Sequence, residues 1–484
     1  MASSVKRCWI TGFSLLRRIS AGSLSTSRGF AGRRLGAQMT VMMMSTGVNS
    51  SPSSSRKISP WLMLPPVIEE GGDVVYKFFN LSEEKEESFR KKRSKLEEEI
   101  ADAKFVGSSH GWLALFNQRN NNNLFLYNPI TNRHIKLPPI ETLPDPMINL
   151  PDGRGSVSKL ILSSSPDDDD DQCIAMMTFG PGDRLAFCHP CRSTEWTPIG
   201  KLFFSSYGRA YENPFIVDGF GMLYGRAYED FVYCSRLKRF TCITQFAIHL
   251  FFGSLIYPTS QLEDWDLSDP QSPISTPCSS FNATPMSQAC YVDSIQNPGI
   301  EGEEWINQNS SLLSNCRQIP YLVFDEQHDR LFIVIRFVID RDSPGVDIGE
   351  LPYDTTSRRY LVHTHPYKTI GFCLIKVIYH QKDGQRVADG VGVVRKGGLG
   401  GLTMFIGMNH SFAVSSADFP NLKPNSIYFT DSNKHANPIY GGHDVGVFDY
   451  VNKTLSHCYS HPCVDDTSSK RIEPPPMWFT PNLY

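Results

Sequence analysis

The stretch LFLYNPITNRHIKLPP, residues 124–139, decides the fold. Aliphatic and aromatic residues alternate in its first half, which predicts a strand. Pro129 presets φ for a turn, and Asn132 tolerates the left-handed corner that such a turn requires. The alternation resumes at Ile135, and the final Pro-Pro pair ends the second strand because proline cannot donate a hydrogen bond to a sheet. The stretch therefore predicts a β-hairpin.

The same hairpin plan recurs along the chain. An apolar strand, a turn and a second strand are expected at 185–199, 230–244 and 445–459, with a weaker copy at 371–380. An additional apolar strand pair precedes several copies, as at 321–340. Repeated units of four short strands predict an all-β fold, a single β-propeller of six or seven four-stranded blades. A two-sheet sandwich is the competing all-β class, but it does not explain the repeated outer hairpin.

Two segments depart from this pattern. Residues 258–318 are rich in Ser, Pro and Asn, which predicts a disordered insertion in the propeller. Residues 82–104 are strongly charged, and their apolar residues are too few for a coiled coil. That composition predicts a solvated helix or a charged hairpin packed outside the propeller.

The composition describes a globular protein with an acidic body. Hydrophobic residues make up 40% and aromatic residues 12% of the 484 residues, as in soluble domains. The net charge is −3, but removing residues 1–30 takes away five of the 47 basic residues and leaves 42 against 50 acidic ones, or −8. Such a body lacks the basic face that phosphate contacts need, so nucleic acid is a poor candidate partner. The longest apolar run, 245–257, is shorter than the roughly 20 residues of a membrane span.

The N-terminus predicts a targeting segment. No acidic residue occurs between Met1 and Ile68, and the Arg- and Ser-rich composition is that of an organellar transit peptide. Wound as a helix, the segment gathers apolar residues on one arc and arginines towards the other, which suits the mitochondrial import machinery. A chloroplast or dual destination is the alternative, whereas an Arg-Arg pair interrupts the apolar core that a secretory signal needs. The targeting arginines are Arg7, Arg17, Arg18 and Arg28.

The domain organisation follows from these segments. A transit peptide is expected over 1–30 with cleavage near 30/31, because Arg28-Gly29-Phe30 resembles a mitochondrial processing site. Residues 31–58 are expected to form a flexible linker, and residues 59–484 the propeller.

Few residues suggest chemistry. Cys188 and Cys191 form a CxxC pair, which is typical of redox sites or of half a zinc site. A zinc site needs a second pair, and the sequence offers only the His and Cys residues of 457–463. His363 and His365 would share one face of a strand, without a third ligand at close spacing. We therefore expect ordinary turn residues at these positions, no cofactor, no metal and no catalytic residue.

Several motifs accompany the opening stretch in a fixed order along residues 59–481. They are SPWLMLPP (59–66), FVGSSHGWLALF (105–116), FIGMNHSFAVSSADFPNLKPNSIYFTD (405–431), DVGVFD (444–449) and PPPMWFTP (474–481). Together they resemble the plant family called domain of unknown function 295, whose fold is the KIB-type β-propeller. The resemblance implies no catalytic residue, because the family has no recognised one.

The resemblance also bears on function. Many relatives carry an N-terminal F-box and act as substrate receptors of ubiquitin ligases, but the basic presequence occupies that place here. The chain is in this respect similar to the family's organellar branch of crucifers. We therefore expect a mitochondrial propeller that binds another protein as a scaffold or adaptor. The alternatives are a substrate adaptor of an SCF-type ubiquitin ligase with a lost F-box, and an enzyme that uses the propeller channel.

Overall fold

The computed structural model describes most of the chain from Ser59 to Asn482. Within that span, the residues outside the description are 96–98, 101–102, 118–122, 144–156, 168–171, 181–183, 201–202, 205–209, 212–221, 251–254, 283–316, 341–366, 383–384, 395–397, 432–440 and 460–471. The predicted targeting segment and linker over 1–58 also lie outside the described residues. Among those that are described, no helix is both long enough and apolar enough to cross a membrane.

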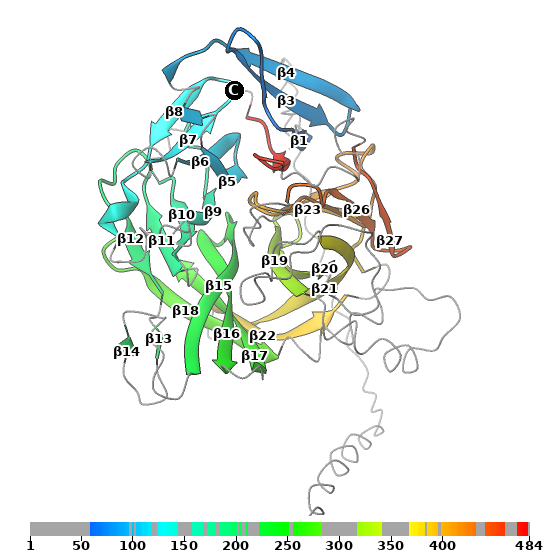
Figure 1. Ribbon diagram of the computed structural model, residues 1–484. Coiled ribbons are helices and arrows are strands. Elements are labelled where there is room, and N and C mark those ends of the chain that lie inside the picture. Colours follow the sequence, from blue (N-terminus) through cyan, green and yellow to red (C-terminus); the bar gives the residue numbers. More distant parts are fainter. Residues whose placement is uncertain are drawn as a thin grey trace, which may run out of the picture. The chain divides into compact units, whose positions relative to one another are not determined.

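The described chain contains three four-stranded sheets, one five-stranded sheet, one nine-stranded sheet and a two-stranded hairpin. The nine-stranded sheet contains two blades, so there are six blades arranged in a ring (Figure 1). We name them blades 1 to 6 in chain order, each written from its inner to its outer strand. Blade 1 contains β28 (Met477–Phe479), β1 (Trp61–Met63), β3 (Val74–Asn80) and β4 (Lys85–Lys91), with β2 (Val67–Ile68) beside β3. Blade 2 contains β5 (Lys104–Ser109), β6 (Trp112–Asn117), β7 (Asn123–Asn128) and β8 (Arg133–Lys136). Blade 3 contains β9 (Val157–Leu162), β10 (Ala175–Phe179), β11 (Arg184–Cys188) and β12 (Thr197–Ile199).

The second half of the chain repeats the arrangement. Blade 4 contains β15 (Met222–Cys234), β16 (Arg239–Leu250), β17 (Leu255–Asp266) and β18 (Ile274–Asn282). Blade 5 contains β19 (Arg317–Asp325), β20 (Arg330–Asp340), β21 (Tyr367–Lys382) and β22 (Gln385–Val393). Blade 6 contains β24 (Phe412–Ser415), β23 (Leu402–Ile406), β25 (Ser426–Phe429), β26 (Gly446–Asp449) and β27 (Thr454–Ser456). The remaining elements are the hairpin of β13 (Phe203–Phe204) and β14 (Ala210–Tyr211) and the 3-10 turn η1 (Ile140–Thr142).

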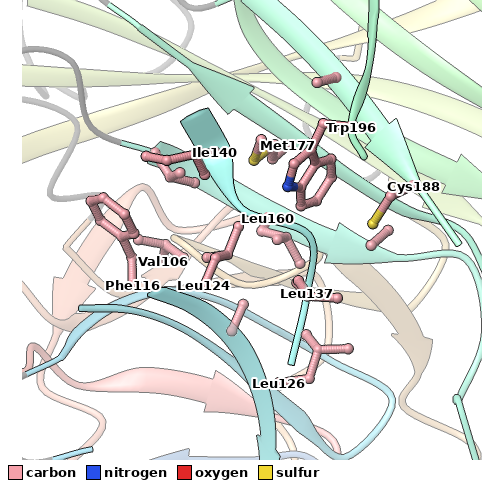
Figure 2. Close-up of a cluster of buried hydrophobic side chains, with 14 of the residues drawn as sticks. Val106, Phe116, Leu124, Leu126, Leu137, Ile140, Leu160, Met177, Cys188 and Trp196 are labelled. Atoms are coloured by element: carbon pink, nitrogen blue, oxygen red, sulfur yellow. The ribbon is translucent and has the colours of Figure 1, made fainter. Parts of the chain in front are cut away.

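Buried clusters between neighbouring blades hold the ring together. The opening hairpin shows how: Leu124 and Leu126 of β7 are buried and face Leu160 and Met177 of blade 3 (Figure 2). The indole of Trp196 lies in the same cluster and donates a hydrogen bond to the carbonyl oxygen of Pro138 over 2.8 Å. The alternation in the sequence thus marks the faces that pack between blades.

Among the described residues, six such clusters occur, one for each pair of adjacent blades. The cluster between blades 6 and 1 closes the ring, because β28 from the C-terminus pairs with β1 from the start of the propeller. In this pairing Leu62 lies opposite Trp478, whose ring packs edge-on against Phe405 at 5.1 Å. The described residues therefore form a closed six-bladed propeller, which confirms the predicted fold class.

One type of turn recurs at the hairpins. The Asn128 side-chain oxygen accepts hydrogen bonds from the backbone N–H groups of Ile130 and Thr131, each at 3.0 Å. Asn132, four positions after Asn128, has a φ of 61°. The same combination of a side-chain acceptor and a left-handed residue four positions later occurs in Asn80 with Glu84, Asp325 with Asp329, and Asp449 with Lys453.

Three expectations about the strands need correction. Residues 371–380 are not a hairpin but part of the single strand β21, since after Gly371 the segment contains no turn-forming residue. The hairpin of 230–244 joins β15 to β16 and is the inner pair of its blade, not an outer one. Within 82–104, Lys85–Lys91 forms the exposed strand β4, which matches the charged hairpin, but β4 is the outer strand of blade 1 and does not lie outside the propeller.

The predicted insertion at 258–318 also begins too early. Residues 258–266 belong to β17, and Ile274–Asn282 forms β18, despite the Ser- and Pro-rich composition. Acidic residues are buried in β17 because neighbouring strands supply donors: the Tyr228 hydroxyl donates to Glu263 at 2.9 Å, and the Thr241 hydroxyl donates to Asp264 at 2.6 Å. The rest of the predicted insertion, 283–316, lies outside the described residues.

Candidate functional site

The centre of the ring is the first candidate site. The inner strands β5, β9, β15 and β19 lie around it together with blade 6 (Figure 1). Polar side chains from four blades are interconnected there, although the sequence around them is mostly apolar. They are His110 of blade 2, Lys159 of blade 3, Asp230 of blade 4 and His410 of blade 6.

Lys159 and Asp230 form an ion pair at this centre. The Lys159 ammonium lies 2.6 Å from the Asp230 carboxylate, and the two side chains are 4% and 0% exposed. The second carboxylate oxygen accepts the backbone N–H of Leu322 in β19 at 2.8 Å. Since a buried charge is tolerated only when it is paired and hydrogen-bonded, this arrangement ties blades 3, 4 and 5 together.

His410 spans the centre from the opposite side. Its backbone N–H donates to the carbonyl oxygen of Ser108 in β5 at 2.8 Å, and its Nε2 accepts the backbone N–H of Tyr233 in β15 at 3.3 Å. Burial, with smaller effects of the nearby His110 and Lys159, lowers the pKa of His410 to about 3. His410 is therefore a neutral hydrogen-bond acceptor that links blades 2, 4 and 6.

The backbone at Gly407, three residues before His410, lies very close to Thr430. Gly407 has a φ of 156°, and a Cβ atom at this position would lie 2.1 Å from the Thr430 hydroxyl. Only glycine fits such a contact without displacing its neighbour. Asn409, which follows, donates its side-chain amide to the carbonyl oxygen of His410 at 2.7 Å. The close contact with Thr430 and the Asn409 hydrogen bond thus fix the conformation of the segment from Gly407 to His410.

A second buried charge lies between blades 5 and 6. Arg336 is 1% exposed and donates to the carboxylate of Asp444 at 2.6 Å, to the Thr369 hydroxyl at 2.7 Å and to the Thr430 carbonyl at 2.8 Å. Burial alone would lower the pKa of Arg336, but the Asp444 carboxylate raises it and keeps the guanidinium charged. Every hydrogen bond named here goes to the chain itself, so we assign Arg336 a structural role.

The cysteine pair suggested by the sequence combines one buried and one exposed thiol. Cys188 ends β11 and is buried, and burial, with a smaller effect of Cys173, raises the pKa of its thiol well above the usual value. Cys191 is exposed in the following turn. The pKa of His189 between them is lowered, mainly by burial. A buried thiol of high pKa is a poor nucleophile and a poor metal ligand.

The other predicted metal candidates are only partly described. His363 and His365 lie outside the described residues, as do His461 and Cys463. Burial raises the pKa of the Cys458 thiol to about 12. Within the described part of the chain, no group of three or more His, Cys, Asp or Glu side chains is arranged to hold a metal ion.

Asp167 has a structural partner that the sequence did not indicate. It is the first residue of the aspartate run 167–171. The Trp112 indole N–H donates to Asp167 at 3.1 Å, and Arg133 pairs with the same carboxylate. Arg133 also lies over the Trp112 ring, 5.8 Å from its centroid. Trp112 is a core residue with 1% exposure.

The central residues escaped the sequence analysis because they match no motif. Lys159 occupies a position within the apolar strand VSKLIL, and Asp230 follows an acidic residue at a register shift of β15. A charged residue inside an otherwise apolar strand was the available signal, since such a residue needs a buried partner. The identity of that partner depends on strands that are far apart in sequence.

Comparisons with known proteins agree with the architecture. A family model described as the KIB1-4 β-propeller matches residues 78–449. No curated protein matches the chain.

Solved structures show only a distant likeness. One is the β-propeller domain of Cps50 (Swd1) from Myceliophteria thermophila, with 8% identity, a TM-score of 0.23 and coverage of 69% of this chain and 89% of that one. Another is a puromycin hydrolase, with 8% identity, a TM-score of 0.22 and coverage of 75% of this chain and 54% of that one. The assignment rests on the blades and on the family match, which covers most of the chain. The chain belongs to the KIB1-4 β-propeller family.

Proposed function

We propose that this protein is a mitochondrial scaffold or adaptor that acts by binding another protein. The observation that carries the proposal is the closed ring of six blades, in which His410 and the Lys159–Asp230 pair bond one blade to another at the centre. We place recognition on the turns and the grooves between blades. Loops and turns on a rigid scaffold are common sites of recognition in propellers.

The mitochondrial part of the proposal is supported by the N-terminal sequence. The acid-free, arginine-containing segment 1–30 has the composition of a transit peptide. The family match does not include this segment, because it begins at residue 78. Location and binding are therefore tested separately.

Proximity labelling in plant cells tests both parts. The labelling enzyme is fused after Tyr484, so that the N-terminus stays native. We expect matrix proteins to dominate the labelled set, with one or a few strongly enriched partners. In a matched variant, Arg7, Arg17, Arg18 and Arg28 are replaced by Gln, and the matrix proteins should disappear from the labelled set.

Two results would contradict the proposal. Labelling dominated by Skp1 and cullin components would favour an SCF-type adaptor over a mitochondrial protein. A cofactor or metal bound to the purified protein that begins at Ala31, detected by native mass spectrometry, would favour an enzyme over a scaffold.

A further inference from the structure

A groove lies between blade 6 and blade 1, at the place where the ring closes. It encloses about 510 Å³ and is open to solvent. Blade 1 contributes Phe79 and Glu84, and blade 6 contributes Lys423, Tyr428 and Ser456. The volume lies in the range of ligand-binding clefts, which are lined by apolar rings with a few polar groups.

Two aromatic rings that line the groove are firmly supported. The Tyr428 ring stacks on Phe405 at 5.0 Å, and Phe405 belongs to the buried cluster between blades 6 and 1. The Phe79 ring contacts Tyr459 at 4.8 Å, and the Tyr459 hydroxyl pairs with Glu86 of β4. The segment after β27 thus crosses from blade 6 to blade 1 and closes one side of the groove.

The two walls carry opposite accessible charges. Lys423 on the blade 6 wall lies 3.1 Å from Asp449, but its side chain is 43% exposed whereas that of Asp449 is 7% exposed. The accessible end of this pair is therefore positive. Glu84 on the blade 1 wall is exposed and negative. An occupant that complements the groove carries an acidic group towards blade 6 and a basic group towards blade 1.

A strand edge borders the groove. β27 ends the strand order of its sheet, and no strand of the described residues pairs with its outer edge. Ser456, the last residue of β27, lines the groove and is exposed. An extended peptide can use such an edge through main-chain hydrogen bonds, while its side chains enter adjacent pockets.

We propose that this groove binds an extended segment of a partner protein, in which one large apolar side chain lies between an acidic and a basic side chain. The apolar side chain enters above Phe79 and Tyr428, the acidic one meets Lys423, and the basic one meets Glu84. This inference rests on the proposed protein-binding function, for which it names the surface and the chemistry of the partner.

Panning of a phage-displayed library of random 12-residue peptides on the full chain tests the groove. We expect enriched peptides with an aromatic or large aliphatic residue flanked by opposite charges. Ser456→Trp fills the groove and should weaken their binding at least tenfold in a fluorescence-anisotropy titration. Leu455→Trp is the matched control: Leu455 is the neighbouring residue of β27, does not line the groove, and points to the opposite side of the strand. The affinity of the Leu455→Trp variant for the enriched peptides should stay within twofold of the wild-type value.

A second pair of variants tests the charges. Glu84→Lys should weaken the binding of peptides with a basic flank. Glu83 is exposed in the same turn but lies outside the groove, so Glu83→Lys should leave the binding affinity unchanged. Thermal unfolding of each variant shows whether the fold is intact, and the paired controls keep a folding defect distinct from a binding defect.

Three results would overturn the groove assignment: no enriched peptide, enriched peptides that bind the Ser456→Trp variant as tightly as the wild type, or equal effects of the variants and their controls. Proximity labelling with the Ser456→Trp chain separates this failure from failure of the function. If the partners are still labelled, the protein binds them through another surface, and only the groove assignment is wrong.

Discussion

Gly111 lies in the turn between β5 and β6, next to Trp112, with a φ of 81°. A Cβ atom there would lie 2.8 Å from the backbone nitrogen of Asn482 near the C-terminus. Two restrictions therefore act at Gly111: its backbone is left-handed, and the C-terminal segment at Asn482 lies close to it. Gly400 is left-handed as well, with a φ of 63°, but a Cβ atom there would meet nothing within 4 Å.

These two glycines provide a matched test. Gly400→Ala should cost about 1–2 kcal/mol of unfolding free energy, the usual cost of a left-handed alanine. Gly111→Ala should cost clearly more, because its Cβ atom also displaces the C-terminal segment. Denaturant unfolding with a common m-value measures both. Equal losses for the two variants would show that the contact with Asn482 does not restrain this turn.

At the scale of elements, the hairpin turns depend on one side chain each. In the turn between β7 and β8, Asn128 is fully buried and satisfies two backbone N–H groups that no strand can reach. The same geometry at Asn80, Asp325 and Asp449 explains why turns of similar length recur in different blades. An Asn or Asp two to three residues before these N–H groups is what the local chemistry requires.

Asn128→Ala should therefore lower the unfolding free energy by about 1–3 kcal/mol, because it leaves the N–H groups of Ile130 and Thr131 without their partly buried acceptor. Thr131→Ala is the control in the same turn: Thr131 is exposed and contributes its backbone N–H, which alanine keeps. We expect the control to change stability by less than about 0.5 kcal/mol. A loss in the control as large as that of Asn128→Ala would contradict the role given to the Asn128 side chain.

At the scale of the whole propeller, closure depends on the two ends of the domain. The three residue pairs between β1 and β28 join the N-terminal and C-terminal ends of the domain into blade 1. Trp478 is fully buried between blades 6 and 1, in one cluster with Phe405 and Leu62. Its loss would leave a cavity next to these two side chains. The centre provides a second connection, since His410 and the Lys159–Asp230 pair join five of the six blades.

Removal of residues 477–484 should abolish the cooperative unfolding transition, because blade 1 loses its inner strand and the ring cannot close. The matched control removes residues 1–55, which precede the first described strand in the sequence. We expect the control to keep the wild-type melting temperature in differential scanning calorimetry. A cooperative transition at an unchanged temperature after the C-terminal deletion would show that closure by β28 is dispensable.

The pH dependence of stability reports on the centre. The pKa of His410 is about 3 in the folded protein and about 6.5 in an unfolded chain. Between these values the unfolded chain binds a proton that the folded chain does not bind. The contribution of His410 to the free energy of unfolding is therefore complete above pH 6.5. It falls as the pH decreases towards 3, by up to about 1.4 kcal/mol per pH unit.

His410→Gln should remove this contribution, because its side-chain oxygen can still accept the Tyr233 N–H but does not titrate. The unfolding free energy of the variant, measured from pH 7 to pH 4, should fall less steeply than that of the wild type. Parallel curves for the two proteins would show that His410 is protonated in the folded state and does not link the blades as described.

The hairpins, their turns and the all-β class were determined by the sequence alone, because alternation and turn chemistry are written in neighbouring residues. Residues 124–139 contain both strands, the acceptor Asn128 and the left-handed Asn132. The same local reasoning failed at 371–380, where one continuous strand pairs with β20 and β22 in place of the expected hairpin. It also failed at 258–282, where β17 and β18 pair although the composition suggested a loop.

Only the tertiary structure decided the number of blades, the polar contacts at the centre and the groove at the closure. Lys159 and Asp230 are 71 positions apart, and Tyr233 and His410 are 177 positions apart. The groove joins Glu84 to Lys423 in the same way, across the closure of the ring. Such contacts depend on how the blades follow one another around an axis, and no local pattern in a strand or turn specifies which distant residue will face it.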